Sequence, residues 1–166
     1  MALDFEELVE AANEVRFRRD GLRLQGGRWR TAEHDLVDDD LAAFEAELFA
    51  VTLHQLRRAT LHALSATGSH LIRSAIAAFD DAVPHMEDIR DVLTHFDAYL
   101  RGEGNLQKDH RLPTSLSVNY GSTSADTTFI EIGPLRFNTG VAVPAADQLA
   151  KVALDEIARL GGPRLS

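Results

Sequence analysis

Residues 38–66 read DDDLAAFEAELFAVTLHQLRRATLHALSA and predict one long helix at the centre of the fold. Apolar residues recur along it at steps of three and four, which is the spacing of one helix face. One stripe consists of Leu41, Phe44, Leu48 and Val51, and a second of Phe49, Leu53, Leu56 and Leu64. A helix that is apolar on two stripes packs between partners, and another subunit could be one of them. We therefore expect a helical bundle.

Three further helices are predicted around this one. Their periodic segments are 3–19, 69–82 and 85–101. The first helix starts at Leu3 or Asp4, and the turn signals that follow, Asp20-Gly21 and Gly26-Gly27, predict a polar connection. Gly102 and Gly104 end the last of the three helices, and a loop follows it.

Near residue 115 the helical spacing gives way to alternating β-branched and aromatic residues. This alternation predicts short antiparallel strands at about 115–120, 127–132 and 135–138. A last helix opens at Pro144 and continues to about Leu160.

The expected fold class is mainly α, with an α+β order of elements. A bundle of about four helices is followed by a short antiparallel β-hairpin or meander and then by a C-terminal helix. No linker-like segment interrupts the chain, so we expect residues 1–166 to form a single domain. Within it we expect the helical bundle at 1–104, a β appendage at 115–138 and the C-terminal helix at 144–160.

The composition excludes several kinds of site. The chain has no cysteine, so disulfides, thiolate metal sites and a thiol nucleophile are excluded. The net charge of −9 disfavours sequence-independent binding to nucleic acid, which depends on many basic contacts to phosphates. The acidic start MALDFEELVE lacks the features of a signal peptide, and no apolar run approaches the roughly 20 residues of a membrane span. We expect a soluble, cytoplasmic protein with no membrane partner.

The segment 86–104, MEDIRDVLTHFDAYLRGEG, carries the candidate site. An apolar ladder from Ile89 to Leu100 predicts a helix face that packs in the core. Arg90 and His95 flank this ladder on opposite sides, about 140° apart on a continuous helix, so they cannot touch within one straight helix. If the apolar seam packed against its symmetry mate, two arginines and two histidines would line one cleft.

The run Arg90-Asp91-Val92-Leu93-Thr94-His95 resembles the R-x(4–6)-H motif of HEPN domains, in the form RN-x-L-x-H with Asp91 in place of the usual asparagine. The resemblance covers roughly residues 35–104. It implies a dimeric helical bundle that cleaves RNA without a metal or other cofactor, at a site formed by both protomers of a homodimer. It also implies that Arg90 binds or stabilises the scissile phosphate and that His95 assists proton transfer. Because many HEPN proteins belong to toxin–antitoxin and anti-phage systems, the implied partners are RNA and an antitoxin protein.

The same spacing occurs at Arg57–His62 and, with one more residue between, at Arg28–His34. The Arg90–His95 pair is favoured because it lies on a late helix, has a polar residue after the arginine and has aliphatic residues at its centre. The alternative interpretation is a non-enzymatic helical binding or assembly module. In that case segment 86–104 is only the polar flank of an amphipathic helix.

A metal site is not expected. His54, His62 and His70 are spaced eight residues apart, whereas metal ligands on a helix stand three or four residues apart. No Glu-x-x-His pair of the kind used by helical-bundle carboxylate sites is present either.

Overall fold

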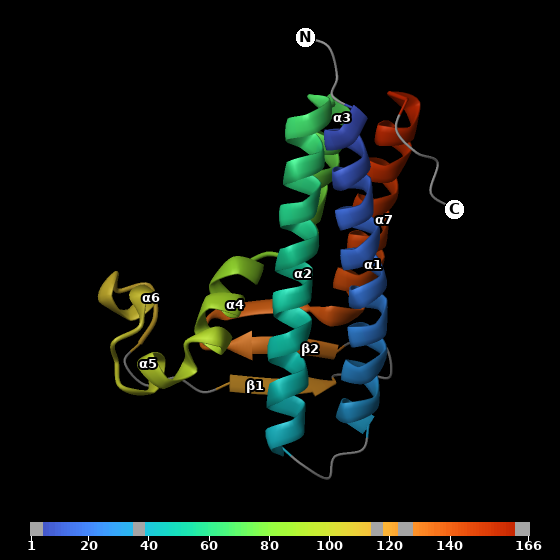
Figure 1. Cartoon of the computed structure of the whole chain (residues 1–166). Coiled ribbons are helices and arrows are strands. Elements are labelled where there is room, and N and C mark those ends of the chain that lie inside the picture. The colour runs from blue at the N-terminus through green and yellow to red at the C-terminus, as the bar shows by residue number, and fades with distance from the viewer. Residues whose placement is uncertain (1–4, 35–38, 114–117, 123–127, 162–166) are drawn as a thin grey trace.

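The computed structural model describes residues 5–34, 39–113, 118–122 and 128–161. Four long helices form a bundle (Figure 1): α1 (Phe5–His34), α2 (Asp39–Thr67), α3 (His70–Ala82) and α7 (Thr139–Arg159). α1 and α2 form an antiparallel hairpin, and α7 packs along α1, α2 and α3. The predicted fold class is confirmed, since the chain is mainly helical with a short antiparallel sheet and a C-terminal helix. None of the described helices has the length and apolar character needed to cross a membrane.

α1 is much longer than the predicted segment 3–19, and it runs through both Asp20-Gly21 and Gly26-Gly27. Its buried apolar residues continue at steps of seven, namely Leu8, Val15, Leu22 and Trp29. Gly26 permits a close helix contact, because a Cβ atom there would lie 3.2 Å from Cγ2 of Val143 on α7. Packing against α2 and α7 therefore overrides the local turn signal, and the predicted polar connection is wrong. The predicted start at Leu3 or Asp4 lies outside the described residues.

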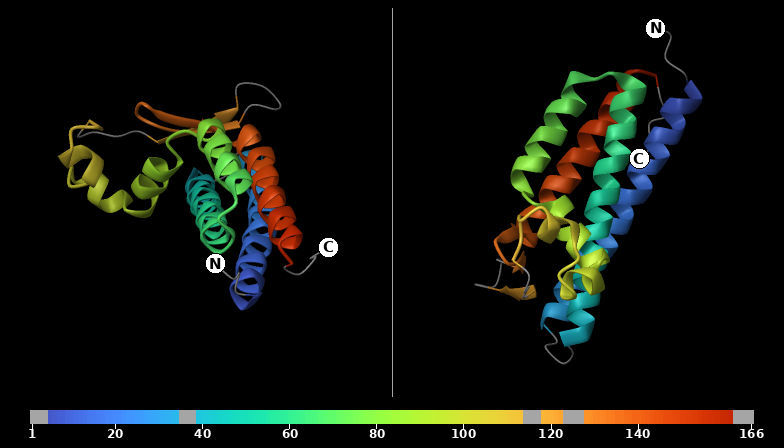
Figure 2. Two further views of the ribbon diagram at one scale, coloured as in Figure 1. Left: turned by 90° about the horizontal axis from the view of Figure 1, so that it is seen from above. Right: turned by 90° about the vertical axis from the view of Figure 1, so that its left-hand side faces the viewer.

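Three short helices project from one side of the bundle (Figures 1 and 2): α4 (Met86–Thr94), α5 (Phe96–Leu100) and α6 (Asn105–Lys108). The predicted helix 85–101 is therefore two helices, and part of the predicted loop after Gly104 is helical. α4 packs on α2.

The strands β1 (Val118–Ser122), β2 (Thr128–Ile132) and β3 (Leu135–Asn138) form one antiparallel sheet in the order β1-β2-β3. All three predicted strands are present, although residues 115–117 and 127 of the prediction lie outside the described residues. Ile130, Ile132 and Phe137 are buried, and the ring of Phe137 stacks 6.5 Å from that of Phe49 on α2. The sheet is thus packed on the bundle, in contact with α2, α4 and α7.

α7 begins at Thr139, before the predicted start at Pro144. The Asn138 side chain caps it by accepting a 3.2 Å hydrogen bond from the amide of Val141. Pro144 removes one hydrogen bond inside the helix, the one to the carbonyl of Gly140. Gly140 is exposed, so water can satisfy that carbonyl. The proline is therefore tolerated one turn inside the helix.

Candidate functional site

α4 is an amphipathic helix with a buried apolar face and open polar flanks. Its first turn carries Glu87 and Asp88, which suit the positive N-terminal end of a helix. The buried face consists of Met86, Ile89, Val92 and Leu93. This face packs on α2 and β3, and Arg90, Asp91 and His95 are left on the flanks.

The apolar seam that flanks the motif is only partly available to a second protomer. Ile89 is fully buried within its own protomer, and Leu93 is nearly so. Phe96 is half-buried, whereas Leu100 is 61% exposed. A second copy can therefore reach the α5 end of the seam, while the α4 end is already covered.

The helix breaks at His95, which separates α4 from α5. The backbone of His95 has φ −122° and ψ 31°, and its carbonyl accepts hydrogen bonds from the amides three and four residues later. Immediately before it, the Thr94 hydroxyl donates to the Arg90 carbonyl at 2.8 Å, a local hydrogen bond of a kind that often bends helices. The His95 side chain stands at this open corner with 61% of its surface exposed.

Asp91 connects His95 to the two helices that follow. Its Oδ1 lies 3.8 Å from Nε2 of His95, and its Oδ2 accepts a 2.8 Å hydrogen bond from the hydroxyl of Tyr99. That hydroxyl also accepts a hydrogen bond from the amide of Leu106 at 3.2 Å, and burial raises the pKa of Tyr99. A carboxylate beside an imidazole can set the orientation of the ring. Asp91 is therefore close enough to form an ion pair with His95 when the imidazole is protonated.

A hollow of about 440 Å³ lies beside His95 and opens to solvent. Residues from α2, α4 and α5 line it, and the polar ones are Glu47, Thr94, His95, Asp97 and Arg101. Side chains of both charge signs meet there around one exposed imidazole. The arrangement offers a proton-transfer group together with polar partners for a ligand.

Arg90 lies on the other flank of α4, where it faces α2. Its neighbour there is His54, whose pKa is lowered by burial and then by the positive charge of Arg90. Nε of Arg90 is buried without a hydrogen-bond partner, and its guanidinium pairs with no carboxylate among the described residues. Of the three predicted catalytic residues Arg90, Asp91 and His95, one protomer brings Asp91 close to His95, whereas no hydrogen bond or ion pair joins Arg90 to His95.

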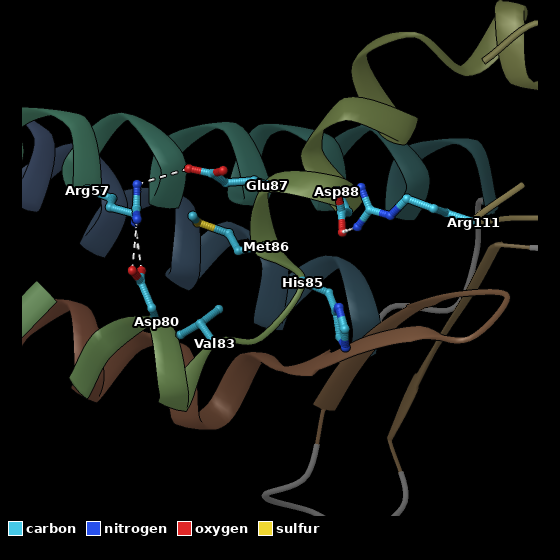
Figure 3. A pocket seen from close by; sticks show the side chains of 8 residues that line it. All are labelled: Arg57, Asp80, Val83, His85, Met86, Glu87, Asp88 and Arg111. Carbon is cyan, nitrogen blue, oxygen red and sulfur yellow. Dashed lines mark hydrogen bonds and ion pairs between the residues drawn. The ribbon is translucent and has the colours of Figure 1, made fainter. Parts of the chain in front are cut away.

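Arg57 on α2, unlike Arg90, is paired with carboxylates of the described residues. Its guanidinium donates to both carboxylate oxygens of Asp80 on α3, at 2.6 and 2.8 Å, and to Glu87 on α4 at 2.9 Å (Figure 3). The same pocket contains the 2.6 Å ion pair between Arg111 and Asp88. Each arginine that lines this pocket is balanced by a carboxylate, in contrast to Arg90.

The three histidines at eight-residue spacing do not converge on one point. His54 faces α4, Nδ1 of His62 lies 3.1 Å from a carboxylate oxygen of Glu14 on α1, and His70 is the first residue of α3. Within the part of the chain that the structure describes, no group of three His, Asp or Glu side chains is placed to hold a metal ion.

Sequence reasoning considered His54 only as a metal ligand and did not connect it with Arg90. His54 stands far from Arg90 in the sequence, and only the packing of α4 on α2 brings the two together. Nothing in the residues around His54, such as the preceding Leu53, indicates that His54 will contact Arg90.

Comparisons with protein-family models, with curated proteins and with solved structures give no match for this chain. The HEPN resemblance therefore stays a prediction. It rests on the sequence motif from Arg90 to His95.

Proposed function

We propose that the protein is a HEPN-like, metal-independent endoribonuclease of the toxin or defence type, acting as a homodimer. The observation that carries the proposal is the guanidinium of Arg90, which is half-buried, lies beside His54 and has no carboxylate partner among the described residues. An arginine that no acid neutralises is suited to an anionic ligand, and its planar fork matches phosphate.

The chemistry assigned to the site needs two kinds of group. Arg90 stabilises the negative charge that develops on a phosphoryl oxygen of RNA. His95, exposed at the corner between α4 and α5 and close to Asp91, transfers a proton. Neither role requires a metal ion.

The proposed dimer supplies the contact that one protomer lacks. Phe44 on α2 is 53% exposed, one turn before Glu47 of the hollow beside His95, and Leu100 on α5 is also exposed. A two-fold contact through these side chains would cover apolar surface, and the shared site requires that it also place His95 of one protomer beside Arg90 of its partner. An antitoxin protein would then act by covering the hollow beside His95.

One observation favours a second candidate, a non-enzymatic helical binding module. Arg90 and His95 do not meet within the protomer, and the chain is acidic overall. In this case the exposed apolar residues of α2 serve only to hold a partner.

RNA cleavage in the presence of EDTA tests the proposal. Arg90→Gln and His95→Gln should each abolish cleavage, whereas two matched controls should retain it. Arg73→Gln removes an exposed arginine on α3, and His110→Asn removes an exposed histidine with φ 57°, a backbone state that asparagine tolerates. Cleavage that survives in folded Arg90→Gln or His95→Gln would refute the site.

Mixing the two inactive variants tests the shared site. If Arg90 and His95 act across the dimer, a mixed dimer has one intact site, and subunit exchange should restore about a quarter of the wild-type activity. If both groups act within one protomer, mixing should restore none. Absence of cleavage in every condition would favour the binding module.

A further inference from the structure

Arg90 and His54, which carry or can carry positive charge, are neighbours where α4 packs against α2, and the exposed Arg58 lies one turn along α2 toward the α1 side. Neither arginine forms an ion pair with a described residue. The chain has a net charge of −9, and other arginines such as Arg57 are paired with carboxylates. A cluster of unpaired basic groups in such a chain is suited to binding an anion.

The cluster has some nitrogen atoms that are shielded from solvent and others that solvent can reach. Nδ1 of His54 and Nε of Arg90 are shielded from solvent and have no hydrogen-bond partner. Nε2 of His54 and the two Nη atoms of Arg90 also have no partner among the described residues, but they are not shielded. Buried polar atoms without partners lower stability and are uncommon in folded proteins, so a local role is indicated.

We propose that His54, Arg58 and Arg90 form an anion seat within one protomer that binds a phosphate group of single-stranded RNA. The two Nη atoms of Arg90 donate to two phosphate oxygens, and Arg58 supplies a second positive charge. Nε2 of His54 donates a third hydrogen bond. The choice of RNA rests on the proposed function, whereas the affinity for phosphate rests on the cluster alone.

Two acids lie near the seat, and neither forms an ion pair with it. Glu14 on α1 lines a pocket together with Arg58, but its carboxylate lies 3.1 Å from Nδ1 of His62. Glu87 on α4 is the other.

Among the charged groups that act on His54, only Glu87 raises its pKa, while Arg90, Arg58 and Arg57 lower it. Glu87 accepts a 2.9 Å hydrogen bond from Arg57, which holds this carboxylate toward the α3 side of α4 (Figure 3). The seat therefore keeps a net positive potential.

Phosphate binding at this seat is linked to protonation of His54. Burial and the three arginines lower the pKa of His54 in the free protein. A bound phosphate is negatively charged and raises that pKa, so binding takes up a proton between the two values. The affinity for phosphate consequently falls as the pH rises through the pKa of His54 in the complex.

The test is an NMR titration of the histidine imidazole signals of the full chain with two probes. Inorganic phosphate tests the seat, and a short 2′-O-methyl RNA tests the nucleic-acid ligand without cleavage. Both should shift the His54 signals saturably, and phosphate should raise the pKa of His54. Arg58→Gln and Arg90→Gln should each weaken binding about tenfold, whereas Arg73→Gln on α3 should leave it unchanged.

The outcomes separate the seat from the proposed function. Absence of a His54 response, or an equal loss in Arg73→Gln, overturns the seat even if RNA is cleaved with dependence on His95. A response to phosphate but not to the modified RNA overturns RNA as the ligand. Binding of both probes with no cleavage of unmodified RNA supports the seat and removes the proposed activity.

Discussion

The hydroxyl of Tyr99 joins three short helices through two hydrogen bonds, to Asp91 and to the amide of Leu106. Replacing Tyr99 by phenylalanine keeps the buried ring but leaves a carboxylate oxygen and a buried amide without this partner. We expect Tyr99→Phe to lower the free energy of unfolding by about 1–3 kcal/mol. Urea denaturation followed by circular dichroism measures this change.

Asp91→Asn is the matched control for Tyr99→Phe, because asparagine retains an acceptor for the tyrosine hydroxyl. Its loss of stability should be the smaller of the two. If Tyr99→Phe unfolds at the wild-type urea concentration, the hydroxyl does not hold these helices together.

Glu156 on α7 ties that helix to the start of α3 and makes stability depend on pH. Hydrogen bonds from Arg159 and then from Ser69 lower its pKa from 4.5 to about 2. Since the folded pKa lies below the unfolded one, the stabilisation is present above 4.5 and is lost as the pH falls toward 2. The difference in unfolding free energy between wild type and Glu156→Gln should therefore shrink between about pH 6 and about pH 3. A difference that is constant over that range would contradict this assignment.

At the residue scale, the sequence predicted the motif but not its surroundings. Asp91 looked like a departure from the asparagine of the motif, yet it pairs with His95 and Tyr99. The neighbour of Arg90 proved to be His54, because side-chain partners on different helices depend on how those helices pack.

At the scale of elements, Gly104 lies between α5 and α6 and packs closely against the ring of Tyr99. A Cβ atom at this position would lie 2.2 Å from two carbons of the buried Tyr99 ring. We expect Gly104→Ala to lower the unfolding free energy by about 1–3 kcal/mol, because the ring has no room to move. Thermal and urea unfolding of the variant measure the loss.

Gly27, inside α1, is the matched opposite of Gly104. A Cβ atom there would meet nothing within 4 Å, and alanine favours the helix. Gly27→Ala should therefore raise the unfolding free energy by about 0.5–1 kcal/mol. Equal effects of the two alanine substitutions would show that close contact with Tyr99 is not the cause at Gly104.

The elements that sequence reasoning predicted well are those in which local preference and packing agree. α2 and α3 have strong apolar periodicity, and the Ser69 side chain caps α3. The errors occurred where packing outweighs a local signal. In α1, burial of Leu22 and Trp29 keeps the chain helical through Asp20-Gly21 and Gly26-Gly27. In α7, the first turn of the helix forms before Pro144. The helix breaks at His95 although no glycine or proline lies there, so the sequence did not predict this break.

For the whole molecule, the proposed dimer makes a prediction about mass in solution. Phe44 is exposed beside the hollow that contains His95, and a charge there would be driven into the dimer contact. Phe44→Asp should convert a dimer into a monomer at micromolar concentration, with RNA cleavage lost in parallel, since burial of an unpaired charge opposes association. Sedimentation equilibrium measures the mass.

Phe17→Asp is the control, because Phe17 is 70% exposed on α1 and takes no part in the proposed contact. It should leave the mass unchanged. A wild-type protein that is monomeric, or a Phe44→Asp variant that stays dimeric, would exclude this contact as the dimer interface.

The paired guanidinium of Arg57 has one more consequence for the molecule. Glu87 lies within electrostatic reach of His54, one turn before Arg90 on the same helix. If Arg57 did not occupy that carboxylate, Glu87 could turn to Arg90 and block the phosphate seat from within. If the proposed seat binds phosphate, the hydrogen bond from Arg57 keeps the competing carboxylate of Glu87 away from Arg90. In an acidic protein, one arginine that binds a nearby carboxylate can in this way leave a second arginine free to bind a ligand.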